Sequence, residues 1–538
     1  MTQWNAQNLA DALSRNAELF PLQEALVIDG KRLSYGELHE QVREAAQGLR
    51  ALGVRRGDHV AVCMGNTVEW VIFFYAAARV GAVTVPVNTR FKQDELAYCL
   101  KQADVKLLFV VDRFLKIDFI TMLRPICPGI DGALPDRALP KLENLVVLGS
   151  DVPKGAITFD EMLALGTTWD EPDFDDVIPG DVLLMQFTSG TTSYPKGVML
   201  THDNMLRNAA YVAERFDLQQ GDRYFSARPF YHVAGTTLSL LAALTVGACL
   251  LSTQTFDAGE ALRIMSQESC THTSGNDTMF LMLLSHPDFD NYPLKLRGGW
   301  ASAGAEVTRR IVERMGMTGV CQAYGLSEAS PNVCMSWHHD DLEKRINGWA
   351  HVLDGIDVRI HDSETRKDLP EGTTGEILVR GWSVMKGYYK MPGQTANAID
   401  DEGWLHTGDF GVMDEDGRLR FASRIKDVFR VGGENVAPAE VEDVLHRHPK
   451  VRQAQVVGVP DPRLIEVPAA YVILKEGEHA TPEEIIEWSK ARMANFRVPR
   501  YLKLVDTFEN IGMTGSAKVQ KNKLRAQALI DFDLEDKT

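Results

Sequence analysis

Residues 182–204 read VLLMQFTSGTTSYPKGVMLTHDN and decide the fold. An apolar run over 182–187 is typical of a buried strand, and a helical pattern capped by Thr201 or Asp203 continues to about Phe216. Glycines let the backbone between them approach a polyanion, hydroxyls can donate to phosphate oxygens, and Lys196 adds positive charge. The loop is either a phosphate site or a polar surface turn, and its spacing is not that of a Walker loop. Its candidate phosphate-binding residues are Thr188, Ser189, Gly190, Thr191 and Thr192.

Length and composition limit the class of protein. A chain of 538 residues is too long for one ordinary core, so we expect two or more domains. The net charge of −17 argues against a nucleic-acid partner. Seven cysteines without a C-x-x-C pair indicate free thiols in a reducing compartment. The N-terminus lacks a signal-peptide pattern and no apolar segment is long enough to span a membrane, so we expect a cytoplasmic protein.

Strands and helices alternate along most of the chain. Residues 8–22 predict an amphipathic helix, and residues 25–34 predict a hairpin around Asp29-Gly30. Alternation over 34–111 predicts parallel-rich sheets layered with helices, and the tail from Val456 alternates again. The expected fold class is α/β, with a large N-terminal domain and a small, mobile α+β C-terminal domain.

The loop TSGTTSYPKG at 188–197 resembles the signature loop of the adenylate-forming superfamily, which includes acyl-CoA synthetases, firefly luciferase and the adenylation domains of peptide synthetases. Further motifs follow in the family's order, and the resemblance extends from Leu33 to Arg525. Four positions depart from the usual pattern: Ser193 and Ala517 replace Gly, Gly512 replaces Pro, and Ser327 replaces Thr.

The resemblance implies a nucleotide site. In QAYGLSE at 322–328, Tyr324 would stack on adenine, Ser327 would contact the α-phosphate and Glu328 would hold Mg²⁺. Asp409 would bind both ribose hydroxyls. Outside such motifs, a carboxylate at a helix start or after Gly is usually solvated or a turn residue. The implied nucleotide-binding residues are Thr188, Ser189, Gly190, Thr191, Thr192, Lys196, Gly304, Ala305, Tyr324, Gly325, Ser327, Asp409, Arg424 and Lys518.

The resemblance also implies an acyl pocket. RPFYHVAG at 228–235 matches a histidine motif beside the acid, where His232 would act as a gate; a lone histidine is otherwise an ordinary core or surface residue. Phe230 stands where amino-acid-activating relatives have Asp, which disfavours an α-amino acid. Residues 275–284 contain no arginine, which disfavours malonate. Met279 belongs either to the pocket wall or to an ordinary core helix. The implied acyl-pocket residues are Tyr231, His232, Asn276, Met279, Ala303 and Gly304.

The last hundred residues resemble the family's mobile cap. We expect an AMP-binding domain over 1–425 and a cap over 426–538, with Lys426 at the hinge. Gly432 and Gly433 would line the CoA tunnel, and Lys518 would be catalytic. On composition alone these residues are a basic strand, a glycine turn and a surface lysine. The implied catalytic residues are Lys518, His232, Lys196 and Glu328.

The implied reaction is ATP-dependent ligation of an apolar carboxylic acid, which is fatty, alicyclic or aryl, to CoA through an acyl-adenylate. ATP, Mg²⁺ and CoA are the expected cofactors and co-substrates, the acid is the small-molecule partner, and a homodimer is compatible with the sequence. Two alternatives stay open. The acceptor could be a separate carrier protein, or the chain could be a catalytically impaired nucleotide-binding regulatory protein.

Overall fold

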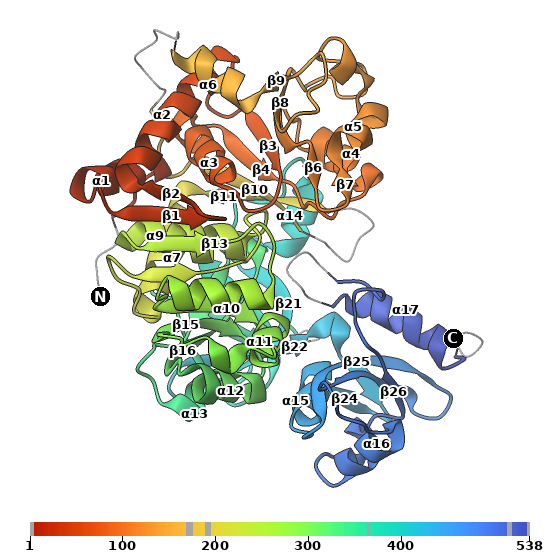
Figure 1. Cartoon of the computed structure of the whole chain (residues 1–538). Helices are drawn as coiled ribbons and strands as arrows, with labels where there is room; N and C mark the ends of the chain where they lie inside the picture. Colours follow the sequence, from red (N-terminus) through yellow and green to blue (C-terminus); the bar gives the residue numbers. More distant parts are fainter. Residues whose placement is uncertain (1–4, 168–175, 189–194, 363–364, 514–518, 535–538) are drawn as a thin grey trace.

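The computed structural model describes residues 5–167, 176–188, 195–362, 365–513 and 519–534 (Figure 1). The described chain forms a seven-stranded sheet, a thirteen-stranded sheet and a five-stranded sheet, together with a two-stranded ribbon of β6 (Arg113–Phe114) and β7 (Ile117–Asp118). The first two sheets and their helices make up the larger part, and the third sheet with its helices makes up the smaller part. The expected α/β class, with a large and a small unit, is confirmed.

The seven-stranded sheet is parallel except for one hairpin. Its order is β11-β10-β4-β3-β5-β8-β9, and only β10 and β11 pair antiparallel. Leu107 and Phe109 of β5 join one apolar cluster while Leu108 and Val110 join another, because successive side chains of a strand point to opposite faces. The strands are β3 (His59–Cys63), β4 (Val83–Pro86), β5 (Leu107–Val111), β8 (Asn144–Leu148), β9 (Ile157–Thr158), β10 (Val182–Thr188) and β11 (Lys196–Thr201).

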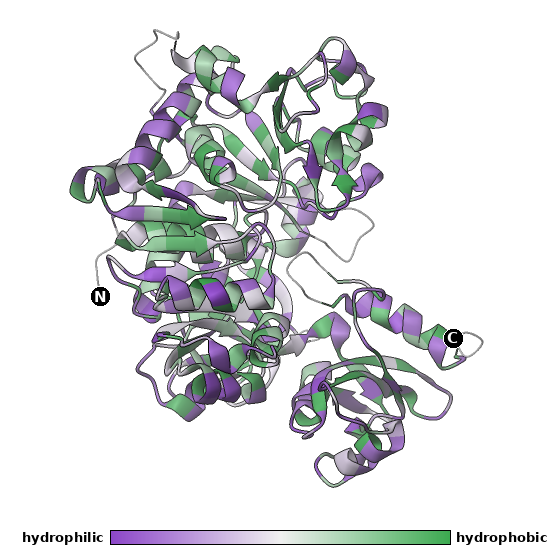
Figure 2. Ribbon diagram, viewed as in Figure 1, coloured by the Kyte–Doolittle hydropathy of each residue, from purple (hydrophilic) through white to green (hydrophobic). Residues whose placement is uncertain are grey.

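Helices cover both faces of this sheet. One face holds α2 (Tyr35–Ala51), α3 (Val68–Val80) and α6 (Phe159–Thr167), and the other holds α4 (Gln93–Gln102), α5 (Phe119–Ile126) and η1 (Pro128–Asp131). The strands and the inner helix faces carry most of the hydrophobic colour in Figure 2. Helix α2 begins with a capping box in which Ser34 and Glu37 satisfy each other's backbone N–H groups.

The thirteen-stranded sheet is parallel at one end and antiparallel at the other. Its order is β19-β20-β21-β22-β18-β17-β16-β15-β14-β12-β13-β1-β2, and the parallel pairs run from β1 to β16. The strands are β1 (Glu24–Ile28), β2 (Lys31–Ser34), β12 (Arg223–Phe225), β13 (Cys249–Ser252), β14 (His272–Asn276), β15 (Gly298–Ser302), β16 (Gly319–Gly325), β17 (Asn332–Met335), β18 (Ala350–Val352), β19 (Ile356–His361), β20 (Gly375–Gly381), β21 (Leu405–Met413) and β22 (Arg418–Arg424).

Two layers of helices flank the parallel end. The inner layer packs between the two sheets and consists of α1 (Leu9–Leu19), α7 (His202–Arg215), α8 (Val233–Gly235), the π-helix η2 (Thr236–Leu241) and α9 (Ala242–Val246). The outer layer consists of α10 (Ala258–Gln267), α11 (Asp277–Leu284), η3 (Phe289–Asn291) and α12 (Ala305–Met315). The remaining elements of the larger part are η4 (Ser327–Ala329), α13 (Leu342–Ile346) and α14 (Pro392–Ala398).

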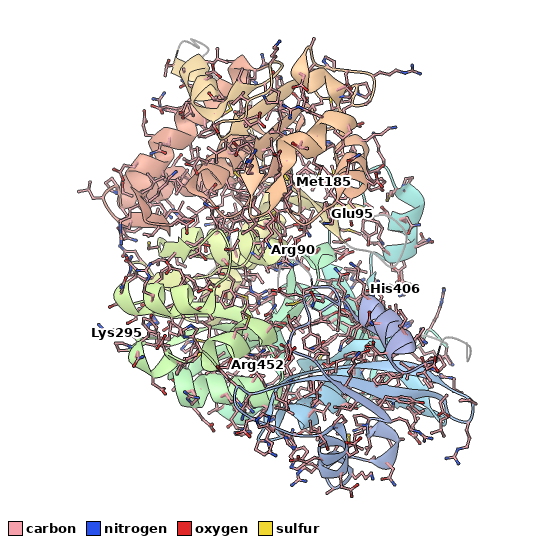
Figure 3. The ribbon with its side chains drawn as sticks, turned by 45° about the vertical axis from the view of Figure 1, so that its right-hand side comes forward. Arg90, Glu95, Met185, Lys295, His406 and Arg452 are labelled. Atoms are coloured by element: carbon pink, nitrogen blue, oxygen red, sulfur yellow. The ribbon has the colours of Figure 1, made fainter. Side chains whose placement is uncertain are left out.

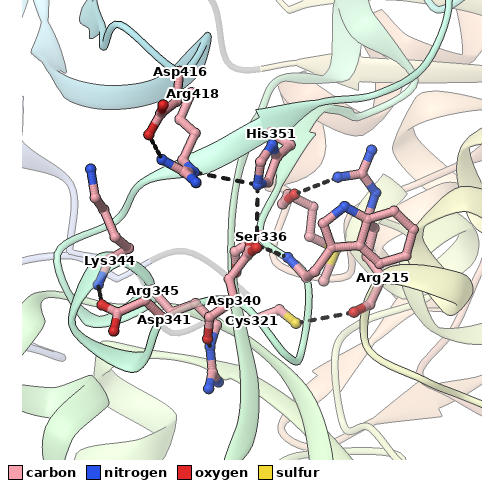
Figure 4. Close-up of polar contacts among 12 residues, drawn as sticks. Arg215, Cys321, Ser336, Asp340, Asp341, Lys344, Arg345, His351, Asp416 and Arg418 are labelled. Carbon is pink, nitrogen blue, oxygen red and sulfur yellow. Dashed lines mark hydrogen bonds and ion pairs between the residues drawn. The ribbon is translucent and has the colours of Figure 1, made fainter.

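A polar network joins β16 to the strands beside it (Figure 4). Gln322 N–H donates to Ser336 Oγ at 3.0 Å, and the thiol of Cys321 donates to the backbone oxygen of Arg215. His351 lies 3.3 Å from Asp340, and the Arg418 guanidinium lies 3.4 Å from His351. The first two contacts hold β16 in place, and the other two join β18 to the segment after β17 and to β22. Strand β16 ends in the motif that contains Tyr324.

The five-stranded sheet forms the smaller part. It contains β23 (Phe429–Val431), β24 (Glu434–Val436), β25 (Val451–Asp461), β26 (Ile465–Leu474) and β27 (Tyr501–Leu504), with α15 (Pro438–His446), α16 (Pro482–Lys490), η6 (Asn495–Arg497) and α17 (Lys521–Asp531) around it. It contacts the outer helices of the larger part on the side of Arg452 (Figure 3). Gln453 donates to Thr278 Oγ1 at 3.2 Å, and Arg310 donates to the backbone oxygen of His446 at 2.8 Å.

One expected connection is wrong. The sequence predicted a strand, a loop and then a helix, but β11 lies between the loop and α7. Val198 and Leu200 of β11 are fully buried, and the strand pairs with β10 from Thr188↔Lys196 onward. The apolar step after the loop is therefore a strand rather than a connection, and Thr201 caps α7 as expected.

All seven cysteines are buried free thiols, as predicted. Across the described ranges, no helix combines the length and the apolar character that a membrane span requires.

Candidate active site

The hairpin β10–β11 holds the two ends of the candidate phosphate loop. Thr188 closes β10 and lies opposite Lys196, the first residue of β11. The Thr188 hydroxyl is buried and has no hydrogen-bond partner among the described residues, so it is available to a further group. Ser189, Gly190, Thr191 and Thr192 lie outside the described residues.

Lys196, Tyr388 and Glu328 form a contiguous cluster beside that loop. The Lys196 ammonium lies 4.1 Å from the centroid of the Tyr388 ring, and Tyr388 Oη donates to Glu328 Oε1 at 2.9 Å. Burial, followed by the Glu328 carboxylate, raises the pKa of Tyr388, so the phenol keeps its proton and continues to donate. Backbone N–H of Met385 donates to the carbonyl of Glu328 at 2.9 Å, which fixes this residue from a second direction.

Glu328 fits the chemistry of a magnesium ligand. Mg²⁺ is usually held by one or two carboxylates together with substrate phosphates and waters. One Glu328 oxygen accepts from Tyr388, and the other has no hydrogen bond within the part of the chain that the structure describes. No cluster of three or more His, Cys, Asp or Glu side chains suited to a metal occurs among the described residues. The donor set therefore suits a metal that phosphates help to hold.

Tyr324 and Asp409 meet across the sheet from β16 and β21. Tyr324 Oη donates to Asp409 Oδ2 at 2.9 Å, and both residues are buried. Burial, followed by Asp409, raises the pKa of Tyr324 well above its usual value. The Tyr324 ring stacks on Phe421 of β22 with centroids 5.3 Å apart and planes 13° apart. Arg424, paired with Asp409 in the β21–β22 register, lies 3.7 Å from Asp409 Oδ1.

The turn after Tyr324 requires glycine. A Cβ on Gly325 would lie 1.9 Å from the Pro331 oxygen, so a side chain does not fit. Ser327 then begins the short helix η4, which carries Glu328. A strand-to-loop turn therefore separates Tyr324 from Glu328.

The predicted acyl-side residues cluster at the carboxyl ends of β12, β14 and β15. His232 caps α8 and its Nδ1 accepts from Ala234 N–H at 3.1 Å. Gln186 of β10 donates to the Tyr231 oxygen at 3.0 Å, which ties the histidine motif to the strand before the phosphate loop. Asn276 caps α11 by accepting from Met279 N–H.

The glycine-rich turn and Met279 occupy distinct surroundings. Gly304 N–H donates to Asp277 at 2.8 Å, and Gly304 caps α12, which begins at Ala305. Ala303 is half-buried. Met279 packs in the outer apolar cluster, as a residue of an ordinary core helix would. Its place in an acyl pocket stays a prediction.

Lys426 lies in η5 (Ile425–Asp427), between the last strand of the large sheet and the first strand of the small one. Partial burial, followed by the Arg424 charge, lowers its pKa. Gly432 and Gly433 form the β23–β24 turn with φ of 58° and 98°, a conformation that favours glycine. A Cβ on Gly432 would lie 3.1 Å from Cδ2 of Leu464, which is a tight contact. The hinge, the tunnel and the 425/426 boundary stay predictions, and Lys518 lies outside the described residues.

The sequence motifs missed four residues that the fold brings to this site. Phe421 is a large aromatic residue that is 38% exposed on β22, and it joins the site by stacking on Tyr324. Tyr388 lies in a connection with no motif of its own. Gln186 and Arg228 belong to the quoted motifs, but the sequence contained no signal that assigned either residue a role.

The larger of two described cavities lies elsewhere. It measures about 720 Å³ and lies beside Arg56, Asp181 and Lys386, with Val182 and Met185 in its wall. Those β10 residues precede Thr188, so this cavity belongs to the opposite end of the strand, and the convergent motif residues mark the candidate site instead.

The motifs and their geometry define a nucleotide-dependent acid-activating enzyme, and comparisons with known proteins agree. The family model described as AMP-binding enzyme matches residues 13–389, and the model described as AMP-binding enzyme C-terminal domain matches residues 440–518. The chain belongs to the AMP-binding enzyme family, and the resemblance to the adenylate-forming superfamily is confirmed.

Two relatives match over nearly the whole chain. A putative acyl-CoA synthetase, YngI, of Bacillus subtilis (strain 168) is 37% identical over 97% of both chains. The human mitochondrial medium-chain acyl-CoA ligase ACSF2 is 34% identical over 97% of this chain and 88% of its own.

Solved structures match in the same way. The anthranilate CoA ligase AuaEII in complex with anthranoyl-AMP superposes with a TM-score of 0.88 at 25% identity, over 98% of each chain. ATP-bound MatB from Rhodopseudomonas palustris gives a TM-score of 0.81 at 26% identity, over 98% of this chain and 100% of its own. The chain is thus an enzyme of the acyl-CoA and aryl-CoA ligase family, which works through an acyl-AMP.

Proposed function

We propose that this enzyme activates a carboxylic acid with a largely apolar skeleton and transfers it to CoA. The acid's carboxylate attacks the α-phosphate of ATP, which gives acyl-AMP and pyrophosphate. The CoA thiol then attacks the acyl carbon and releases AMP. The first step needs charge neutralisation and alignment more than covalent help from the protein.

The observation that carries this proposal is the convergence of the nucleotide-side residues. Three separate segments supply these residues: the β10–β11 hairpin gives Thr188 and Lys196, the motif at 322–328 gives Tyr324 and Glu328, and the β21–β22 hairpin gives the Asp409–Arg424 pair. Lys196 would neutralise phosphate charge, and Asp409 would accept from ribose hydroxyls. Glu328 would hold Mg²⁺, which when bound supplies further positive charge at the phosphates. Tyr388 holds the Glu328 carboxylate in position.

The acyl-side residues would orient the acid for that attack. His232 lies at the start of α8, where it would separate the acid carboxylate from the approach of the second substrate. Gln186 fixes the backbone of Tyr231 beside it. Gly432 and Gly433, which lack side chains, would admit the pantetheine arm of CoA once the small unit has rotated about Lys426.

The test measures both half-reactions with the wild-type enzyme. A panel of fatty, alicyclic and aryl acids is supplied with ATP and Mg²⁺, and pyrophosphate release is recorded with and without CoA. We expect acid-dependent pyrophosphate release, and acyl-CoA as the product when CoA is the sole acceptor. Pyrophosphate release without acyl-CoA would favour a carrier protein as acceptor, and no release with any acid would favour the regulatory alternative.

Cytoplasmic location remains an expectation from the sequence, and a homodimer is compatible with the sequence. Light scattering of the purified enzyme distinguishes a monomer mass from a dimer mass.

A further inference from the structure

A buried arginine without a carboxylate partner stands next to the histidine motif. Arg228 follows β12 and is 6% exposed, and its guanidinium packs over the Trp300 ring at 4.2 Å. Its Nε and Nη2 atoms are buried and have no hydrogen-bond acceptor among the residues that the structure describes. Burial lowers the pKa of Arg228 to about 10. Among the described groups, the Tyr224 phenol is the one that acts in the opposite direction. The guanidinium is therefore charged at neutral pH and lacks a counterion among the described residues.

The position of Arg228 places it on the acyl side of the sheet. Phe225 and Ala227 pack in the outer cluster, whereas Tyr224 packs in the inner one and Ser226 bonds to Ser239 of η2. Side chains alternate along an extended segment, so Arg228 shares the inner face, where it meets Trp300.

The register of β14 and β15 gives the depth of this position. Asn276 pairs with Ser302, and Ser274 pairs with Trp300 two residues earlier on both strands. Asn276 is a predicted acyl-pocket residue, as are Ala303 and Gly304 directly after Ser302. Trp300 therefore lies two residues deeper, roughly 7 Å along the strands, and the Arg228 guanidinium reaches its ring. An acid whose carboxylate lies near His232 would direct its far end toward Arg228.

The polar groups beneath Arg228 already satisfy one another. Trp300 Nε1 donates to Tyr224 Oη at 3.0 Å, and Tyr224 Oη donates to Ser274 Oγ at 2.8 Å. Ser274 Oγ donates to Ser226 Oγ at 3.2 Å, which lies 2.8 Å from Ser239 Oγ. The guanidinium is the unsatisfied donor of this group. A buried charge without a partner is costly, and a ligand that supplies an acceptor offsets that cost.

We propose that Arg228 recognises an acceptor oxygen at the far end of the acyl group, so that the preferred acid carries a second carboxylate or a ketone oxygen on an otherwise apolar skeleton. This rests on the proposed function, because it needs an acid in the pocket beside His232. In the sequence, a pairing arginine for a second carboxylate was expected within 275–284 only, and that stretch contains none. The fold supplies one from the segment after β12, which pairs with β14.

The test compares matched acids in matched variants. Hexanoate, 5-oxohexanoate and hexanedioate, and the corresponding eight- and ten-carbon sets, are assayed for pyrophosphate release with wild type, Arg228→Met and Arg228→Lys. A site that hydrogen-bonds a substrate group rejects the analogue lacking it. We expect wild type to prefer oxygenated acids about tenfold or more over plain ones at the fitting length. The methionine variant should lose that preference, and the lysine variant should keep part of it for the diacid.

Arg223→Met is the matched control. Arg223 lies on β12 and pairs with Glu24 and Glu268, so its loss should lower stability without changing acid preference. The proposal is overturned if wild type prefers plain acids at every length, or if Arg228→Met slows all acids by one factor, as it would if Arg228 held the reacting carboxylate or only supported the fold.

A second readout separates this proposal from the proposed function. Ligands that bind the folded state raise the unfolding temperature. The fitting diacid or keto acid should raise the unfolding temperature of the wild type and not that of Arg228→Met, whether or not pyrophosphate forms. If the diacid or keto acid stabilises the wild type but no acid releases pyrophosphate, the proposed function is contradicted and the role of Arg228 is supported. If pyrophosphate is released without any preference among the acids, the proposed function is supported and the role of Arg228 is contradicted.

Discussion

The nucleotide side and the acyl side of the site both take residues from the thirteen-stranded sheet and from the β10–β11 hairpin, but their polar groups differ in how far they are satisfied. On the nucleotide side, the carboxylates are held, because Tyr324 bonds to Asp409 and Tyr388 bonds to Glu328, while the buried Thr188 hydroxyl has no partner among the described residues. On the acyl side, Arg228 and Gln186 keep buried polar atoms without partners. Side chains that already hydrogen-bond to one another are preorganised for the nucleotide, which every turnover uses. Buried polar groups without a partner on the acyl side can instead form hydrogen bonds with the acid, which varies. Changes on the first side should therefore affect all acids alike.

The largest effect is expected at Lys518, whose role is implied by the resemblance. Its ammonium would lie between the acid carboxylate and the α-phosphate, two groups that repel each other. Lys518→Ala should slow adenylation ~10²–10³-fold or more, as the loss of an oxyanion donor does. Thioester formation from supplied acyl-adenylate should hardly change. Rapid-quench assays of each half-reaction provide the measurement.

The control for Lys518 is Lys523→Ala, because Lys523 is exposed. Lys521 is unsuitable, since its ammonium bonds to Glu442 and to the Val456 oxygen and so supports the fold of the small unit. An equal loss in both half-reactions would show that the terminal motif has been aligned to the wrong lysine.

A smaller effect is expected at Asp409. Asp409→Asn keeps the size of the side chain but removes the charge that accepts from Tyr324 and faces Arg424. A hydrogen bond to a charged group contributes about 2 kcal/mol, so the KM for ATP should rise about 30-fold, by the same factor for every acid. Asp414→Asn, in the turn of the same β21–β22 hairpin, should leave that KM unchanged. If the rise in the KM for ATP differed from one acid to another, the nucleotide side and the acyl side would not act independently.

Much of the fold follows from local sequence signals. The hairpin at Asp29-Gly30 and the capping box at Ser34 are set by residues within a few positions of one another, and the hairpin is found as predicted. Strand β11 was missed because its burial depends on helices from distant segments. A short apolar run gives no periodicity that distinguishes a strand from a connection.

The candidate site divides in the same way. Tyr324, Glu328 and Asp409 belong to motifs, so they could be named from the sequence. Tyr388 reaches Glu328 only because the connection after β20 folds back toward η4, and a sequence separation of sixty residues carries no local signal. Arg228 was quoted within the histidine motif, but its lack of a counterion is a tertiary fact.

The smallest effect is expected at Tyr388, which touches Glu328 rather than the nucleotide. Tyr388→Phe keeps the ring beneath Lys196 and removes the donor to Glu328. Groups that orient a metal ligand typically contribute tenfold or more to metal affinity, so the Mg²⁺ concentration for half-maximal adenylation should rise about tenfold, while the KM for every acid stays constant. Tyr389→Phe is the matched control, because the neighbouring phenol donates instead to Asp104. A lower Mg²⁺ requirement in Tyr388→Phe would mean that the phenol competes with the cation for Glu328, and the nucleotide side would then be held closed rather than ready.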